Sequence, residues 1–278
     1  MCINREYANY YFAYTDVSIN YKNKIMSKLI PIVLIFIGIF CNSYSQEFSI
    51  KIIKEKNPKD TTAEYEFPIL IGKNEQITTK INSNLSFEFL EVKYQNQVKG
   101  LFKNVWGNDK NSLAKLSFLK VGETYLNHRI YSITLSGESC GASCSNFETH
   151  CNFDLKMGNR IKLESIISEK YKTIFLDSIS KWKLAKVQFE IANCKSNINN
   201  SNIKAVEKEY YKSMIPEYED CFTHYESYDY IDFSIISKDL TIYLESCSNR
   251  DENSYIFKLN LNEWRWILSD YAIELTNN

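Results

Sequence analysis

The sequence predicts an α+β fold in which a mostly antiparallel sheet carries helices packed on one of its faces. Three observations predict this class. Apolar and polar residues alternate with a period of two in several segments, as they do in half-buried strands. One long segment instead repeats its apolar residues at helical spacing, and strand-like blocks occur on both sides of it. The composition, 44% hydrophobic and 24% charged, is that of an ordinary globular chain.

The first strand-like block opens with residues 48–53 and 65–70. Pro68 cannot donate to a ladder, so we expect the second of these strands to lie at a sheet edge. Apolar residues at helical spacing then predict a helix over residues 75–92. Alternation returns over residues 115–135 and 149–155, and the sequence Lys-Met-Gly-Asn that follows is typical of a tight turn.

The second half begins with the longest helical pattern, over residues 163–182. Residues 187–192 are predicted to form a strand, and an asparagine-rich loop and a short helix ended by Pro216 follow. Three alternating segments, residues 231–235, 240–244 and 255–261, predict an antiparallel meander. Residues 264–273 close the chain.

The N-terminal segment is predicted to be an export signal. Residues 29–41 (LIPIVLIFIGIFC) form an uncharged apolar run of 13 residues preceded by three lysines, which is too short to cross a bilayer comfortably. Ser43 and Ser45 lie where a signal peptidase reads small residues, so we expect cleavage before Gln46. The alternative is an uncleaved anchor, in which the chain meets the membrane only through this segment. Both outcomes place the remaining chain outside the cytoplasm, either periplasmic or secreted.

The expected organisation is an extension with a signal peptide over residues 1–45, followed by a single α+β domain over residues 46–278. A division of that domain into subregions 46–125 and 126–278 is the alternative. The 233 residues after the signal are enough to bury one sizeable core. The net charge of -1 provides no field that favours nucleic acid, so nucleic-acid binding is excluded.

Cysteine usage agrees with export, because an even number of cysteines remains after the signal. In an oxidising compartment such a set predicts three disulfides, and the spacing does not choose among the pairings. We expect the first two of these cysteines to be bridged to the third or to distant partners. The six disulfide candidates are Cys140, Cys144, Cys151, Cys194, Cys221 and Cys247.

Several short segments carry a resemblance to a known domain: residues 65–70 (YEFPIL), 80–82 (KIN), 141–142 (GA) and 153–158 (FDLKMG) leading to 161–163 (IKL). Their order resembles a bacterial envelope domain that occurs in lysozyme-sensing anti-sigma factors and beside peptidoglycan deacetylase domains. The resemblance spans nearly all of the expected mature chain. It implies a non-catalytic α+β module outside the cytoplasm, which in some members binds a protein such as lysozyme.

The chain departs from that family's pattern in two ways. Family members often carry a histidine after the Gly-Ala dipeptide, whereas this chain has Ser143, and the six cysteines are not part of the pattern. The deacetylase chemistry of some members belongs to a separate metal-binding domain, whose histidine pair and paired aspartates are absent from this sequence. No catalytic residue carries over.

A nucleophile motif offers an alternative function. Residues 137–141 (GESCG) match the G-x-S-x-G elbow of serine hydrolases, with Ser139 as nucleophile. His224 with Asp177 or Asp220 completes a triad in the hydrolase order. The elbow requires a long apolar helix after the serine, whereas the residues that follow are polar and then strand-like. A small-residue hairpin is therefore the favoured interpretation of this motif.

A metal site is the second alternative, since Cys140, Cys144, His150 and Cys151 cluster in sequence, and Cys221 with His224 forms a C-x-x-H pair. Such spacing suits zinc. Oxidation of thiols outside the cytoplasm favours disulfides instead. We therefore expect no metal and no cofactor.

An acidic and aromatic stretch at residues 216–233 (PEYEDCFTHYESYDYIDF) is the candidate binding surface. Carboxylates attract cationic partners, and exposed tyrosines supply rigid contact area. A solvated acidic loop is the competing interpretation. The sequence thus predicts an exported binding or sensing module without catalysis, with a basic protein or a cell-wall component as partner. The candidate contacts are Tyr218, Glu219, Asp220, Tyr225 and Tyr228.

Overall fold

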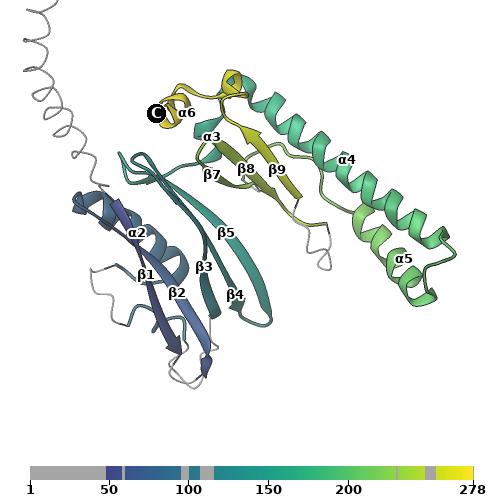
Figure 1. Cartoon of the computed structure of the whole chain (residues 1–278), viewed down its shortest axis with the longest axis horizontal. Helices are drawn as coiled ribbons and strands as arrows, with labels where there is room; N and C mark the ends of the chain where they lie inside the picture. Colours follow the sequence, from purple (N-terminus) through teal and green to yellow (C-terminus); the bar gives the residue numbers. More distant parts are fainter. Residues whose placement is uncertain are drawn as a thin grey trace, which may run out of the picture. The chain divides into compact units, whose positions relative to one another are not determined.

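The computed structural model describes residues 48–57, 60–94, 100–106, 116–229, 231–247 and 255–277, and Phe48–Asn278 forms one compact unit (Figure 1). The predicted α+β class is confirmed, with a mixed six-stranded sheet, a three-stranded sheet and, in the described ranges, five α-helices. The expected signal segment, the expected cleavage site and Tyr230 lie outside the described residues. No helix in the described ranges has both the length and the apolar character needed to cross a membrane.

The six-stranded sheet has its strands side by side in chain order, and every neighbouring pair is antiparallel except the parallel pair β2 and β3. Strand β2 is therefore not the edge strand that Pro68 suggested. Only Tyr65 of β2 is in register with β3, at Leu119, so Pro68 lies outside that pair and its missing N–H breaks no bond to β3. The strands are β1 (Phe48–Asn57), β2 (Asp60–Gly72), β3 (Leu116–Leu126), β4 (Ile130–Cys140), β5 (Cys144–Asp154) and β6 (Asn159–Arg160).

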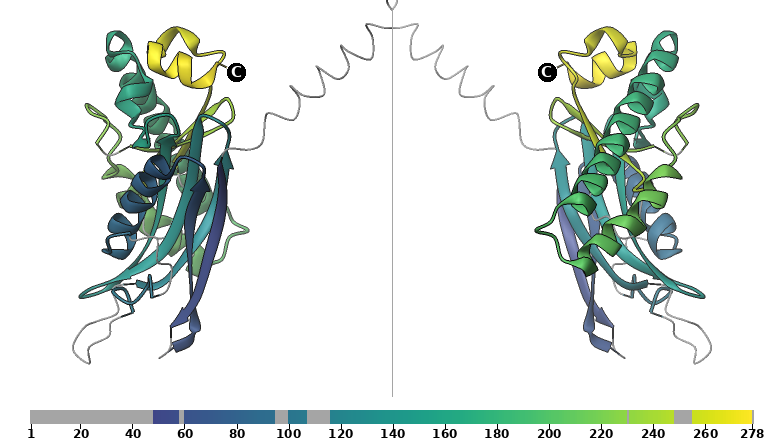
Figure 2. Two further views of the ribbon diagram at one scale, coloured as in Figure 1. Left: turned by 90° about the vertical axis from the view of Figure 1, so that its left-hand side faces the viewer. Right: turned by 90° about the vertical axis from the view of Figure 1, so that its right-hand side faces the viewer.

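Helix α2 (Glu75–Leu90) confirms the first predicted helix and lies against one face of this sheet (Figure 2). Its N-cap is Asn74, whose side chain accepts a hydrogen bond from the N–H of Ile77 at 3.2 Å. The buried Asn82 amide accepts from the N–H of Leu70 and donates to its carbonyl, both at 2.9 Å. One side chain thus ties the helix to the backbone of β2.

The long helical pattern of the second half is divided in the structure. It forms α3 (Leu163–Ile166), a 3-10 turn (Glu169–Tyr171) and α4 (Lys172–Asn199). The predicted strand at residues 187–192 is wrong, because these residues belong to α4. Helix α5 (Ala205–Glu219) also runs past Pro216, which was expected to end it.

The predicted meander is confirmed as an antiparallel sheet of β7 (Asp232–Ile236), β8 (Asp239–Leu244) and β9 (Tyr255–Asn260). A 3-10 turn (Arg265–Ile267) and α6 (Asp270–Thr276) complete the described chain. Trp182 of α4 makes edge contacts with the rings of Tyr255 and Phe257 on β9. The long helix therefore packs against this second sheet. The prediction had all helices on one face of a single sheet, whereas α2 packs against the first sheet and α4 against the second.

The buried apolar residues fall into two clusters. The first contains residues of β1 to β5 and α2, and the second, apart from Ile130, contains residues from Ile161 onwards. The division in the chain falls between Leu155 and Ile161, later than the boundary between the subregions 46–125 and 126–278. Strands β4 and β5 complete the first core while their other face meets the second sheet.

The expected set of three disulfides is wrong for this structure. Cys140 is bonded to Cys144, so the expected bridges from these two residues to Cys151 or to distant partners are also wrong. Cys221 is bonded to Cys247. The cysteines at positions 151 and 194 are free thiols and are buried, one in the first core and one on α4. Burial raises the pKa of the Cys151 thiol to about 12. A thiol in this environment is a small apolar core residue rather than a crosslink.

Candidate functional site

The two sheets meet where the outer edge of β7 lies against side chains of β4 and β5. The Ser132 hydroxyl donates to the carbonyl of Ile235 at 2.6 Å. The buried Asn152 amide donates to the carbonyl of Phe233 at 2.7 Å and accepts from the N–H of Ile235 at 2.9 Å. These side chains satisfy backbone groups that an edge strand would otherwise leave unpaired. The junction is therefore a specific polar seam beside two apolar cores.

A cleft of about 720 Å³ opens along this seam. A smaller adjoining pocket of about 230 Å³ shares five of its lining residues. The lining of the larger cleft comes from β5, β6, β7, β8 and the segments that flank them, so residues far apart in sequence form one wall. The lining residues of the larger cleft are Asn146, Glu148, His150, Arg160, Asp229, Ile231, Asp232, Tyr243, Leu244, Glu245 and Ser246.

His150 lies at the centre of the cleft and is held on several sides. Its Nδ1 is 2.7 Å from Oδ2 of Asp232, which also accepts from the backbone N–H of His150 at 3.1 Å. The imidazole lies flat on the ring of Tyr243, with centroids 3.7 Å apart and planes 8° from parallel. Its Nε2 is 3.6 Å from Oε1 of Glu148. The buried ring therefore has a fixed position, with a carboxylate near each nitrogen.

The electrostatic character of the cleft is acidic. Carboxylates of Glu148, Asp229, Asp232 and Glu245 stand among its described lining residues. Arg160 is the one arginine or lysine among them, and its Nη1 binds both carboxylate oxygens of Glu88 at 2.7 Å. Because Glu88 belongs to α2 and does not line the cleft, the guanidinium is neutralised from outside. The lining carboxylates keep their negative field.

The Tyr243 side chain of the cleft wall is uncharged at neutral pH. Burial raises the pKa of Tyr243, and its hydroxyl is 3.1 Å from the hydroxyl of Ser234. His150 is buried against one face of the Tyr243 ring, so the half-buried Tyr243 is the aromatic side chain available between the carboxylates of the cleft. Such an arrangement suits a cationic group, which gains from both the carboxylates and an aromatic face.

The hydrolase elbow is not formed. Strand β4 ends at Cys140 and turns directly into β5, so GESCG is the tip of a hairpin in which Ser139 pairs with Ser145. The hairpin that the sequence favoured for this motif is confirmed. His224 is exposed and lies 3.3 Å from Glu226, and Asp177 on α4 binds Lys181 at 3.1 Å. The strand-to-helix turn that would expose a nucleophile is replaced by this hairpin.

The residues considered for zinc are also separated. Cys140 and Cys144 are bonded to each other, Cys151 lies in the first core, and His150 faces the cleft. Glu138 brings a carboxylate oxygen within 4.8 Å of the two bonded sulfurs. Sulfur atoms in a disulfide are not thiolates, so this group does not offer the donor set that zinc requires.

The predicted binding face is only partly exposed. Tyr218 and Tyr225 are buried in the second core, so the expectation that these rings are exposed is wrong. Glu219 and Asp220 are exposed at the end of α5, and Tyr228 is half-buried. The same acidic stretch also supplies three cleft residues, Asp229, Ile231 and Asp232. The sequence analysis missed Glu148, Tyr243 and Glu245, because each is an isolated residue with no motif around it.

Comparisons with known proteins give a likeness in structure. No family model matches the sequence, and no curated protein matches it. A DUF3298 family member from Bacteroides fragilis is 13% identical, with a TM-score of 0.48 over 82% of this chain and 95% of that chain. A DUF3298 family protein from Pseudomonas aeruginosa PAO1 is 12% identical, with a TM-score of 0.47 over 81% of this chain and 95% of that chain. The chain thus has a structural match to bacterial DUF3298 proteins.

Proposed function

We propose that this protein is a binding module whose acidic cleft receives a cationic group of a basic partner protein. The observation that carries the proposal is the charge of the cleft. Carboxylates of Glu148, Asp229 and Glu245 line it together with the Asp232–His150 pair, while the lining guanidinium of Arg160 is paired with Glu88. No step of chemistry is required of these residues, and the module acts by association.

The physical basis is electrostatic complementarity. A lysine or arginine side chain entering the cleft leaves water for a site where several carboxylates and the Tyr243 face are already in place. Glu148, Asp229 and Glu245 are exposed, so each charge pair with a ligand is individually weak and the attraction comes from several carboxylates acting together. Complementary charge also accelerates encounter, and salt weakens it. A basic protein, rather than a neutral glycan, fits a cleft of this polarity.

The sequence resemblance supports the same role, because some members of the envelope family bind lysozyme, a basic protein. We propose accordingly that the module works outside the cytoplasm after removal of residues 1–45. N-terminal sequencing of the protein recovered from bacteria that express the full chain tests this, with Gln46 as the expected first residue. An intact N-terminus on cytosolic protein would contradict export.

The binding proposal is tested with three neutral substitutions made together, Glu148→Gln, Asp229→Asn and Glu245→Gln. Fluorescence anisotropy with a fluorescein-labelled oligolysine peptide, and with labelled lysozyme, measures the affinity at low and at physiological salt. Each lost charge pair at an exposed site is worth about 0.2–1 kcal/mol, so the triple variant should bind between about threefold and about a hundredfold more weakly. The affinity of the unmodified protein should fall as salt rises.

The matched control changes the same kind of residue away from the cleft. Glu219→Gln with Asp220→Asn removes two exposed carboxylates at the end of α5 that do not line it. This variant should bind both probes as the unmodified protein does. Loss of binding in the control but not in the cleft variant would overturn the proposal and return the contact face to α5.

A further inference from the structure

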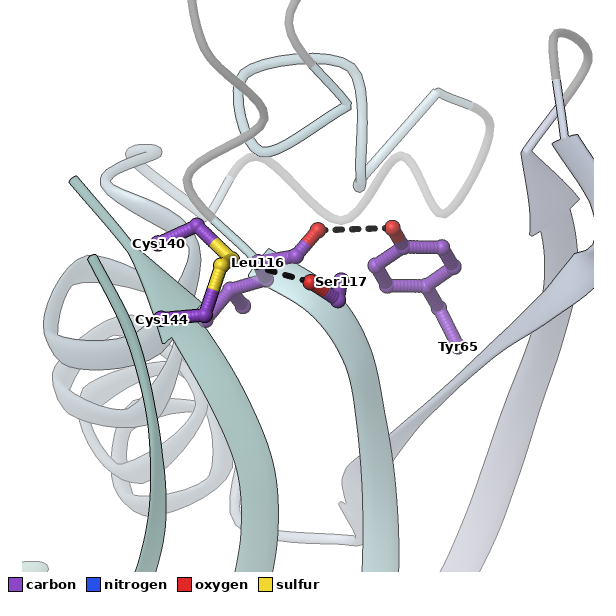
Figure 3. Close-up of a disulfide and its surroundings, with 5 residues drawn as sticks. All are labelled: Tyr65, Leu116, Ser117, Cys140 and Cys144. Carbon is purple, nitrogen blue, oxygen red and sulfur yellow. Dashed lines mark hydrogen bonds between the residues drawn. A yellow bond between two sulfur atoms is a disulfide. The ribbon is translucent and has the colours of Figure 1, made fainter. Parts of the chain in front are cut away.

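The disulfide between Cys140 and Cys144 has an environment that differs at its two sulfurs. Cys144 is exposed at the start of β5, whereas Cys140 is half-buried at the end of β4. The Oγ of Ser117 lies 3.0 Å from Sγ of Cys140 (Figure 3). A sulfur in a disulfide carries no hydrogen, so the serine hydroxyl is the donor in this contact.

The position of Ser117 is built into the sheet. The register of β3 with β4 shifts at two places, and Ser117 lies at the first of them, between Leu116 and Phe118. The Tyr65 hydroxyl, from β2, donates to the carbonyl of Leu116 at 2.8 Å and holds this segment from the other side. The hydroxyl beside Cys140 is therefore placed by fixed backbone rather than by a mobile loop.

The disulfide is not needed to close the hairpin. Cys140 and Cys144 face each other as the last pair of an unbroken β4–β5 ladder. They are four residues apart in sequence, against 26 for Cys221 and Cys247. A short loop restricts the unfolded chain less than a long one. Cys221 and Cys247 also pack against the second core, whereas the hairpin pair belongs to neither cluster.

We infer that the hairpin tip is a thiol–disulfide exchange site for an external thiol or dithiol. The external thiolate attacks Sγ of the exposed residue Cys144 and forms a new S–S bond there. The Cys140–Cys144 bond breaks, and Cys140 leaves as a thiolate that accepts the hydrogen bond from Ser117. The external reductant supplies the electrons, and a second thiol of the same reductant completes the reduction at Cys144. This inference does not depend on the proposed function.

Glu138 adds a second control on this exchange. Its carboxylate oxygen lies within 4.8 Å of both sulfurs. A negative charge at this distance disfavours both the incoming thiolate and the departing one. Ser117 and Glu138 therefore act with opposite sign on the same step.

The experiment uses the folded full chain and glutathione as the probe. After brief exposure, free thiols are capped with N-ethylmaleimide in acid and the modified cysteines are located by tandem mass spectrometry. The expected product carries glutathione on Cys144 and maleimide on Cys140, with Cys221–Cys247 intact. Ser117→Ala should slow its formation severalfold, and Glu138→Gln should accelerate it. Ser145→Ala, which removes a hydroxyl from the same hairpin, should leave the rate unchanged.

Three results would overturn the inference. Glutathione on Cys140 as often as on Cys144 would remove the asymmetry of the two sulfurs. Opening of Cys221–Cys247 as fast as the hairpin pair would show that the tip has no special reactivity. An unchanged rate in Ser117→Ala, with the circular dichroism spectrum of the unmodified protein, would exclude the serine from the step.

Discussion

Single buried polar side chains connect the layers of this protein. Asn82 ties α2 to β2, and Asn152 ties β5 to β7, each by accepting from a backbone N–H and donating to a backbone carbonyl. An asparagine amide suits this role because it carries a donor and an acceptor in one plane. The side chain imitates the next strand of a sheet. Removal leaves two buried backbone groups without these partners.

Asn152→Ala should therefore destabilise the protein by about 2 kcal/mol or more, because leaving a buried polar group unsatisfied costs about 1–3 kcal/mol. Urea unfolding followed by tryptophan fluorescence measures the change. Asn146→Ala is the matched control, since this asparagine lies on the same strand and is exposed. An equal midpoint for the two variants would show that the seam between the sheets does not depend on Asn152.

The burial of single residues could not be predicted from the sequence. The cysteine count predicted an oxidised set, yet two of the six thiols are buried and free. An even number of cysteines does not show which of them are buried, because the sequence around a core cysteine does not differ in a recognisable way from that around a bonded one. The same holds for Tyr218 and Tyr225, whose acidic neighbours suggested a surface while their rings fill the second core.

At the scale of elements, α4 shows how two periods compete in one segment. Val187, Phe189 and Ile191 alternate with polar residues and predicted a strand. In the structure Val187 and Cys194 are buried while Phe189 is 59% exposed, which is the spacing of one helix face. Strands were predicted well where alternation was long and bounded by turns, as in β7 to β9. The strand prediction for residues 187–192 failed because a short run of alternating apolar residues is compatible with either a strand or a helix.

Lys183 of α4 is a lysine buried where α4 packs against its neighbours. The side chain is buried, its Nζ donates to the Tyr225 hydroxyl at 3.0 Å, and it lies 5.5 Å from the ring centroids of Tyr225 and Tyr255. Burial lowers the pKa of Lys183 from 10.5 to about 8. Between these pH values the unfolded chain binds more protons than the folded protein, so stability rises as pH increases through this window. Below it, lysine is charged in both states and the cost of burying the charge is fully present.

Lys183→Met should accordingly stabilise the protein near neutral pH and remove the contribution of this lysine to the pH dependence of the free energy of unfolding, which approaches about 1.4 kcal/mol per pH unit. Urea unfolding of the unmodified protein and of the variant between about pH 7 and pH 9 checks this. The difference between their two slopes isolates Lys183 from Cys151 and Cys194, whose raised pKa values act with the opposite sign in the same range. Lys181→Met, at an exposed position of the same helix, should keep the slope of the unmodified protein. If the free energy of unfolding has the same slope against pH in Lys183→Met as in the unmodified protein, the slope belongs to another group.

At the scale of the whole described unit, the cleft exists because two sheets meet at a polar seam. Its carboxylates come from β5, from the segment before β7, from β7 itself and from the residue after β8. The stretch 216–233 was the predicted binding surface, and three of its residues, Asp229, Ile231 and Asp232, line the cleft. The others could not be predicted, since no local pattern says which strands of separate sheets lie together.

The most direct test of the acidic cleft maps where a cationic ligand sits. Oligolysine is bound to the full chain, carboxylates are activated with a water-soluble carbodiimide, and the resulting amide crosslinks are located by mass spectrometry. Our account predicts crosslinks concentrated at Glu148, Asp229 and Glu245, and their loss at high salt. Crosslinks concentrated at Glu219 and Asp220, or spread evenly over all exposed carboxylates, would contradict it.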